Sequence, residues 1–246
     1  MQLILPEVNK QSWWYECLYA GLLYVQRVAM CVSAVQTFRN NNRLSAPYPY
    51  DRLPFYQQIS LIGFSLGGNL TLKYLGERGS SVHRAIKNAV TFSVPMDLHA
   101  SCLKISNLSN WIYSQRFLRN LKAKVKVKSK KMAGIDTTGI DKIKNLIEFD
   151  NRYTAPIHGF RDALHYYKEC SSINYVQHIQ IPTLIVNAKN DPFLSKECYP
   201  VDYLKNHSFV KLETPDQGGH VGFSMFGQNG VYWSELRTLE FLQSHG

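Results

Sequence analysis

The sequence predicts an α/β fold in which helices cover both faces of a mostly parallel β-sheet. Short apolar runs bounded by turn residues recur along the chain, as they do in strands that are buried on both faces of a parallel sheet. Segments with helical spacing lie between these runs, which favours strands and helices in succession. The length of 246 residues and the apolar content of 45% suit one α/β domain with a single core.

The first strand and the first helix of this sheet are predicted between residues 58 and 79. Residues 58–64, QISLIGF, form a β-branched and apolar run that ends at a glycine-rich turn. From Gly67 the spacing becomes helical, with Leu70, Tyr74 and Leu75 available for one face, and Gly79 marks the expected end of the helix. A strand, a tight turn and a helix therefore follow one another directly.

Three further strands and a closing helix complete the predicted sheet. Residues 85–92 (AIKNAVTF) and 182–187 (PTLIVN) are apolar runs of the kind that a parallel sheet contains, and residues 209–212 are a shorter candidate. Residues 231–243 carry apolar side chains at helical spacing. We expect this last segment to form a helix that packs on the sheet.

A long segment with little strand character separates the second and third of these strands. It runs from 96 to about 175 and has helical patches near residues 110–121 and 159–170, so we expect a helical cap inserted over the sheet. Residues 1–55 lack the alternating pattern that should build the first strands. We therefore predict a divergent N-terminal segment, residues 1–55, and a domain of residues 56–246 whose N-terminal strands are incomplete.

The segment Gly63–Gly67 matches G-x-S-x-G, with Ser65 at its centre. In this motif the serine lies at a strained turn between a strand and a helix, and the glycines allow the backbone to approach closely. The pentapeptide alone is a weak signal, but the predicted strand before it and the helix after it are the context that the turn requires. The helix N-terminus adds a partial positive charge, and the Leu66 N–H can donate to a developing oxyanion.

A serine hydroxyl needs a base to remove its proton and a carboxylate to orient that base. On the α/β folds that use this motif, the partners follow in the order serine, acid, histidine. Asp191 comes just after the predicted strand 182–187, and His220 lies in the glycine-rich segment QGGHVGF. The alternatives are a helix-capping role for Asp191 and a surface position for His220. Asp97 and Asp162 are rival acids, but both precede the strand after which the acid is expected. The remaining histidines, which precede Asp191 or lack a glycine-rich setting, are His83, His99, His158, His165, His178, His207 and His245.

The chain is strongly basic, with a formal net charge of +10 and a pI near 9.3. Much of the excess lies in one run in which lysines alternate with small or apolar residues and no aromatic residue is interleaved. Because readers of nucleic acids usually add stacking groups, we interpret the run as a solvated face or loop and expect no nucleic-acid partner. A weak attraction to an anionic lipid surface is a second interpretation. The run comprises Lys122, Lys124, Lys126, Lys128, Lys130 and Lys131.

The cysteines predict neither a disulfide framework nor a metal site. They are odd in number and scattered, without a CxxC pair or the cysteine and histidine spacing that zinc requires. The first thirty residues lack an apolar run long enough to span a membrane and do not have the order of features of a secretory signal. We therefore expect a reducing, cytoplasmic location. The cysteines are Cys17, Cys31, Cys102, Cys170 and Cys198.

From about Tyr56 to the end, the sequence resembles the YheT-like branch of the α/β-hydrolases, which also holds the EMB8-type and ABHD-type lipases. Several separate strings carry the resemblance, and together they are highly specific. The strings are ISLIGFSLGGNLTLKYLGE around Ser65, SVPMDL ending at Leu98, TAPIHGF at 154–160, IPTLIVNAKNDPF ending at Phe193, and GGHVGF around His220.

The resemblance implies a serine hydrolase that acts on carboxylic esters through an acyl-enzyme on Ser65. The substrates it implies are small-molecule esters, either lipid-like or with short to medium acyl chains, including monoacylglycerols. His220 would deprotonate Ser65 and later activate water, and Asp191 would hold the histidine tautomer. No cofactor and no metal is required.

The sequence departs from the family's pattern before Gly63. The family places a His-Gly string in an early loop that supplies a second oxyanion N–H, whereas residues 1–55 contain no His-Gly pair and no glycine-rich loop. Loss of one such donor typically costs about 3 kcal/mol in the transition state. Three hypotheses therefore stand, in this order: an ester hydrolase; a truncated, non-catalytic relic that at most binds acyl ligands; and a protein that binds a lipid surface or nucleic acid through the run from Lys122 to Lys131. We also expect residues 1–55 to fold poorly and to leave one edge or face of the sheet uncovered.

Overall fold

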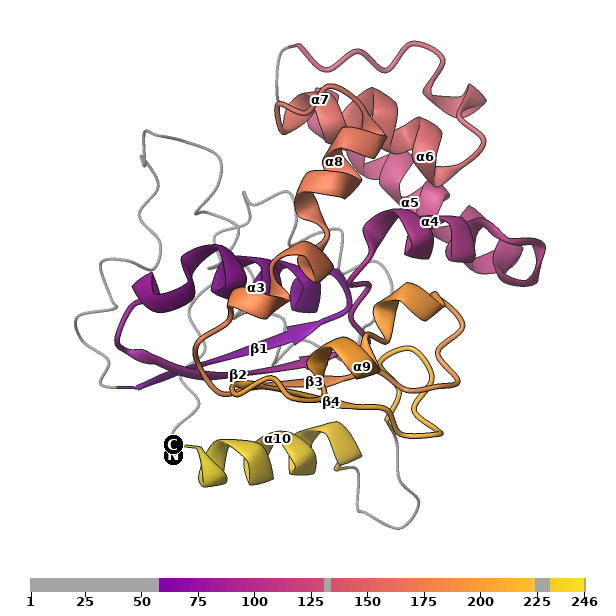
Figure 1. Cartoon of the computed structure of the whole chain (residues 1–246). Coiled ribbons are helices and arrows are strands. Elements are labelled where there is room, and N and C mark those ends of the chain that lie inside the picture. Colours follow the sequence, from indigo (N-terminus) through magenta and orange to yellow (C-terminus); the bar gives the residue numbers. More distant parts are fainter. Residues whose placement is uncertain (1–57, 131–133, 224–230, 246) are drawn as a thin grey trace.

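Four parallel strands form the sheet of this protein, which we describe from a computed structural model that covers residues 58–130, 134–223 and 231–245 (Figure 1). The strands are β1 (Ile59–Phe64), β2 (Ile86–Phe92), β3 (Thr183–Val186) and β4 (Val210–Glu213), and their order in the sheet is their order in the chain. All four strands predicted from the sequence are confirmed. The prediction that residues 1–55 fold poorly and leave one edge or face of the sheet uncovered concerns residues outside the described ranges.

The carboxyl ends of the four strands are level with one another. Phe64 of β1 lies opposite Phe92 of β2, which lies opposite Val186 of β3, and Val186 lies opposite Glu213 of β4. The ladder continues one residue further, because the Ser65 N–H donates to the Phe92 carbonyl at 2.8 Å. Residues that follow the strands therefore meet along one edge of the sheet, as ligand-binding residues do in open α/β sheets.

Helix α3 (Leu66–Arg78) packs on one face of the sheet (Figure 1). It begins directly after Ser65 and ends before Gly79, whose φ of 48° ends the helix as the sequence predicts. Leu72 and Leu75 are fully buried in a cluster with Leu61 of β1 and with residues of β2, β3 and β4. Helix α9 (Val201–Leu204) adds Leu204 to the same cluster.

Helix α10 (Trp233–Ser244) covers the opposite face of the sheet (Figure 1). Phe241 and Leu242 pack against Val90 and Phe92 of β2 and against Leu184 and Val186 of β3. Neighbouring strand residues thus point to opposite faces, and both faces are apolar, which is why the strands read as continuous apolar runs. The predicted fold class is confirmed.

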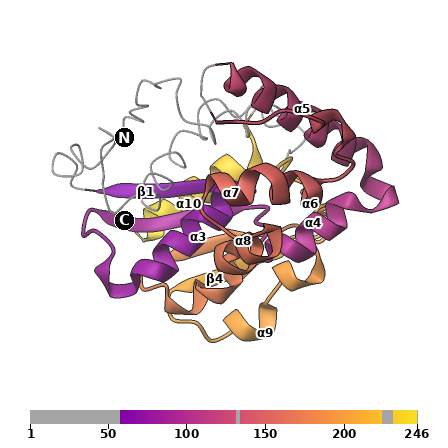
Figure 2. The same ribbon diagram turned by 90° about the horizontal axis from the view of Figure 1, so that it is seen from above.

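A helical cap lies between β2 and β3 in the sequence and stands above the carboxyl edge of the sheet (Figures 1 and 2). It has two apolar clusters of its own, one around Tyr166 and Tyr167 and one around Phe149 and Val125. These clusters explain how a segment without strands can remain folded. Its helices are α4 (Leu98–Ser106), α5 (Trp111–Ser129), α6 (Leu146–Phe149), a π-helical turn (Asp150–Thr154), α7 (Ala155–Ile157) and α8 (Ala163–Cys170).

The lysine run continues helix α5 rather than forming a loop. Lys122 donates from Nζ to the carbonyl of Ile143 at 2.6 Å, and Lys126 forms an ion pair with Asp141 at 2.8 Å. Val125, between them, is buried in the cap. The run up to Lys128 therefore belongs to α5, with lysines on more than one side of the helix, and part of its charge is neutralised within the cap. Within the described ranges, no helix combines the length and the apolar content needed to cross a bilayer.

Candidate active site

Ser65 occupies a strained turn between β1 and α3. Its backbone has φ 51° and ψ −125°, a conformation that non-glycine residues rarely adopt. Two hydrogen bonds hold it there: the Ser65 N–H donates to Phe92, and the Ser65 carbonyl accepts from the Asn69 N–H at 3.2 Å. A Cβ atom at Gly63 would lie 2.8 Å from the Cα of Gly68, so the turn is tight enough to require glycine.

Asp191 lies in the loop that follows β3, and its carboxylate is fully buried. Its Oδ1 accepts a hydrogen bond from the Phe193 N–H at 2.9 Å. It does not cap a helix, because the next helical turn begins at Lys196 and is preceded by Ser195. The rival acids do cap helices: Asp97 accepts from the Ala100 N–H at the start of α4, and Asp162 accepts from the His165 N–H at the start of α8.

His220 lies in the loop after β4 and joins the other two side chains. Its Nδ1 is 2.9 Å from Asp191 Oδ2, and its Nε2 is 2.9 Å from Ser65 Oγ. Because a carboxylate only accepts hydrogen bonds, Nδ1 carries the proton and Nε2 is left to accept from the Ser65 hydroxyl. The structure therefore brings together all three side chains that the sequence analysis selected, in a continuous hydrogen-bonded chain.

Glycines give the His220 loop its shape. Gly219 has a φ of 56°, and a Cβ atom at Gly218 would lie 2.8 Å from the Cβ of Ala188. Asn190, next to the acid, accepts from the Gly219 N–H through Oδ1 at 2.8 Å. This bond ties the histidine loop directly to the acid loop, so the two side chains are held at a fixed separation.

Ser93 and Phe193 support the site, and sequence reasoning missed both. Ser93 follows β2, has a φ of 52°, is fully buried, and accepts from the Val221 N–H through Oγ at 3.0 Å. The ring of Phe193 lies 4.7 Å from the His220 ring, centroid to centroid. The pairing of Ser93 with Val221 depends on folding and leaves no sequence signal, whereas the position of Phe193, two residues after Asp191, could have drawn attention to it.

Leu66 begins α3, so its N–H has no acceptor within the helix. It lies directly after Ser65 and shares the partial positive charge of the helix N-terminus. This is the position from which a backbone N–H can stabilise negative charge on an oxygen bound next to the Ser65 hydroxyl. The segment in which the sequence analysis sought a second donor, residues 1–55, lies outside the described part of the chain.

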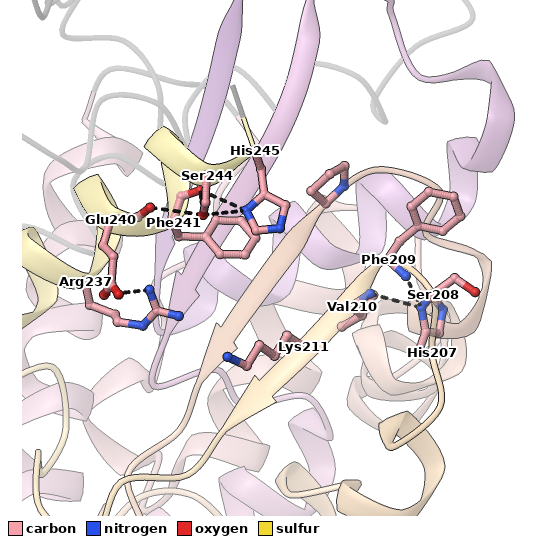
Figure 3. A pocket seen from close by; sticks show the side chains of 11 residues that line it. His207, Ser208, Phe209, Val210, Lys211, Arg237, Glu240, Phe241, Ser244 and His245 are labelled. Carbon is pink, nitrogen blue, oxygen red and sulfur yellow. Dashed lines mark hydrogen bonds and ion pairs between the residues drawn. The ribbon is translucent and has the colours of Figure 1, made fainter.

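A groove of about 340 Å³ lies at the other end of the sheet (Figure 3). It is lined by residues at the starts of β3 and β4 and by the last turns of α10, including His207, Lys211 and Glu240. Because Ser65 lies at the carboxyl end of β1, this groove is not part of the site. Among the described residues, no group of three or more His, Cys, Asp or Glu side chains could hold a metal ion.

The chain resembles several curated hydrolases over most of its length. It is 33% identical over 193 residues to the protein YheT of Escherichia coli, covering 75% of this chain and 54% of the relative. It is 34% identical over 164 residues to mouse phospholipase ABHD3, covering 65% and 39%, and 30% identical over 195 residues to a monoacylglycerol lipase of Saccharomyces cerevisiae, covering 76% and 42%. The chain thus spans about half the length, or less, of these relatives. No family model matches it.

Among solved structures, an esterase of Pyrococcus furiosus aligns with a TM-score of 0.42 at 17% identity, covering 77% of this chain and 54% of that one, a likeness too slight to carry an argument. The parallel sheet with helices on both faces, the turn at Ser65 and the helical cap define an α/β-hydrolase fold. Within that class, the relatives confirm the resemblance to the YheT-like group with its ABHD-type members.

Proposed function

We propose that this protein hydrolyses carboxylic esters through an acyl-enzyme on Ser65. The observation that carries the proposal is the hydrogen-bonded chain from Asp191 through His220 to the Ser65 hydroxyl, with 2.9 Å at both histidine nitrogens. This arrangement supplies a nucleophile, a base and a group that orients the base. The relatives named as a phospholipase and a monoacylglycerol lipase also act on esters, which favours an ester over an amide.

In the first half of the reaction, Ser65 Oγ attacks the ester carbonyl carbon while its proton moves to His220 Nε2. The carbonyl oxygen becomes an oxyanion, and the Leu66 N–H donates to it. The buried Asp191 carboxylate stabilises the imidazolium that forms. Collapse of this intermediate breaks the bond to the alcohol oxygen, which leaves with the proton from His220.

In the second half, water takes the place of the alcohol. His220 removes a proton from the water, and the resulting hydroxide attacks the acyl carbon of the Ser65 ester. The second tetrahedral intermediate then expels Ser65 Oγ, which recovers its proton from His220 and releases the carboxylic acid. The substrates that we propose are acyl esters, including monoacylglycerols.

A fluorophosphonate probe tests this proposal directly. We expect the probe to label the full chain. We expect labelling to disappear in Ser65→Ala but to persist in Ser80→Ala, which replaces an exposed serine in the 3₁₀ turn Gly79–Ser81 that follows α3. Parallel assays with p-nitrophenyl esters of increasing acyl length and with a monoacylglycerol would give the substrate preference. A folded protein that binds fatty acid but neither reacts with the probe nor turns over an ester would support the non-catalytic alternative instead.

A further inference from the structure

Five large apolar side chains gather at the turn between α4 and α5, and all of them are exposed. We call this group the apolar elbow: Leu103, Leu108, Trp111, Ile112 and Tyr113. Leu108 is 91% exposed and Ile112 is 74% exposed, and exposed apolar side chains that cluster, rather than occur singly, mark interaction surfaces. The turn projects from the side of the molecule in both views (Figures 1 and 2).

Basic residues surround the elbow and acids are missing from it. The sequence between Asp97 and Asp136 contains no Asp or Glu, whereas lysine and arginine are frequent there. Arg116 and Arg119, on the outer side of α5, are exposed and form no ion pair with any carboxylate in the described ranges. Lys104, at the end of α4, is also exposed. The apolar elbow is therefore bordered by basic side chains that pair with no carboxylate in the described ranges.

The outer side of α5 continues the same combination of apolar and basic groups. Ile112, Arg116, Arg119, Ala123 and Val127 recur at spacings of three or four residues, and all are exposed. The inner side holds the buried Ser114, Leu118 and Val125, and the last two belong to an apolar cluster of the cap. An apolar tip with a basic flank is the pattern of helices that lie in the interface of a bilayer.

We propose that the apolar elbow and the outer side of α5 bind the surface of an anionic lipid bilayer. Leu108 and Ile112 would enter the boundary between headgroups and acyl chains, Trp111 and Tyr113 would lie at headgroup level, and Arg116 and Arg119 would face the lipid phosphates. Single-stranded nucleic acid fits less well, because the two most exposed side chains are aliphatic and offer bases no stacking surface.

The elbow also adjoins the candidate active site. The Asn110 side-chain amide donates to the carbonyl of Pro192 at 2.8 Å, next to Asp191. The Tyr113 ring lies 5.1 Å from the Phe193 ring, which in turn contacts His220. Docking would therefore bring the site close to lipid, where esters with long acyl chains are found. The docking itself does not depend on the proposed hydrolysis, and Ser65→Ala protein can be used to measure it.

Sedimentation with vesicles tests the proposal. Full-chain Ser65→Ala protein is mixed with vesicles of phosphatidylcholine alone or of phosphatidylcholine with phosphatidylserine, and the bound fraction is measured at low and high salt. We expect binding to the anionic vesicles that weakens with salt. The variant Leu108→Ser/Trp111→Ser/Ile112→Ser should reduce binding by more than about tenfold, since three apolar side chains lose their burial. Arg116→Gln/Arg119→Gln should reduce it by about fivefold for each charge.

Matched control variants distinguish binding through this surface from non-specific binding to lipid. Leu164→Ser/Leu239→Ser removes exposed leucines from α8 and α10, and Arg84→Gln/Lys87→Gln removes exposed charges before and at the start of β2. Both variants should bind as the parent does. Circular dichroism would check that each variant remains folded. Equal loss in the control variants, retention of binding in the elbow variant, or no binding to either vesicle would overturn the proposal. So would self-association that the elbow substitutions abolish, which would identify a second copy as the occupant.

Discussion

Replacing Gly63 by alanine would place a methyl group against the backbone of α3. The new Cβ would lie 2.8 Å from the Cα of Gly68 and 2.9 Å from the carbonyl oxygen of Gly67, whereas ordinary contact begins at 3.4 Å. None of these atoms belongs to a flexible side chain, so β1 and the first turn of α3 must move apart. Overpacking of this kind costs about 1–3 kcal/mol, which corresponds to a loss of about 2–12 °C in Tm for a chain of this size.

The same displacement would move Ser65, which joins β1 to α3. Because the bond from Ser65 Oγ to His220 Nε2 is 2.9 Å long, a shift of a few tenths of an ångström weakens it, and misplacement by 1 Å can cost about 10²-fold in rate. We expect Gly63→Ala to lose about 10- to 100-fold in ester hydrolysis, measured with a p-nitrophenyl ester at a temperature where the variant is fully folded.

Gly159→Ala is the control for this experiment. Gly159 has a φ of 75° and nothing within 4 Å of its Cβ position, so alanine there costs about 1–2 kcal/mol through backbone strain alone. We expect a lower Tm and unchanged activity per folded molecule. If Gly63→Ala kept full activity, or if Gly159→Ala lost as much activity as Gly63→Ala, the argument from close packing at the serine turn would be wrong.

Three further predictions concern the acid, an ion pair and a buried thiol. Asp191→Asn should lower kcat by about 10⁴-fold, because an amide would favour the wrong His220 tautomer; a decrease of less than tenfold in a steady-state assay would contradict the assigned role. Hydrogen bonds from Arg237 hold the pKa of Glu213 below its ordinary value of 4.5, so this pair stabilises the fold above that pH and the contribution is lost as pH falls through the lowered pKa. Arg237→Gln should therefore lower the free energy of unfolding, measured with urea, by about 1–2 kcal/mol at pH 7 and by much less at pH 3. An equal loss at the two pH values would contradict the assigned role of the pair. Burial raises the pKa of Cys102 to about 11, so iodoacetamide at pH 8 should spare Cys102 in native protein and modify it in urea, as peptide mass spectrometry would show; rapid native modification would disprove this.

The sheet and the site were predictable because local patterns determine them. Each strand is a short apolar run, since both faces are covered, and the glycines around Ser65 mark a turn that few other sequences could form. Asp191 and His220 follow successive strands, so their positions in the sequence already place them at one edge of the sheet. The roles of these residues in catalysis remain our proposal, but their convergence was predictable from chain order.

The supporting contacts were not predictable because they depend on packing between distant segments. Ser93 is one of several serines in the sequence, and only the fold brings its Oγ to the Val221 N–H. Helix α5 is also longer than predicted. The helical pattern covers residues 110–121, whereas the helix continues to Ser129 through a segment in which lysine alternates with valine and alanine. That continuation depends on Val125 packing against Ile140 and Phe149, residues from a later part of the cap.

The two ends of the cap are fastened to each other where they meet the sheet. The Leu98 N–H donates to Ser171 Oγ at 2.9 Å, and the Ile173 N–H donates to the Met96 carbonyl at 3.1 Å. The Asn69 side chain of α3 holds the segment that leaves the cap. It donates to the Cys170 carbonyl and accepts from the Ser172 N–H, on either side of Ser171. Because these hydrogen bonds join the two ends of the cap to each other and to α3, the cap can change in sequence while its attachment to the sheet stays the same. On the proposed function, changes between residues 99 and 169 would alter which acyl groups are admitted while the backbone at Ser65 stays in place, provided that the contacts of Asn110 and Tyr113 with the loop after Asp191 are kept.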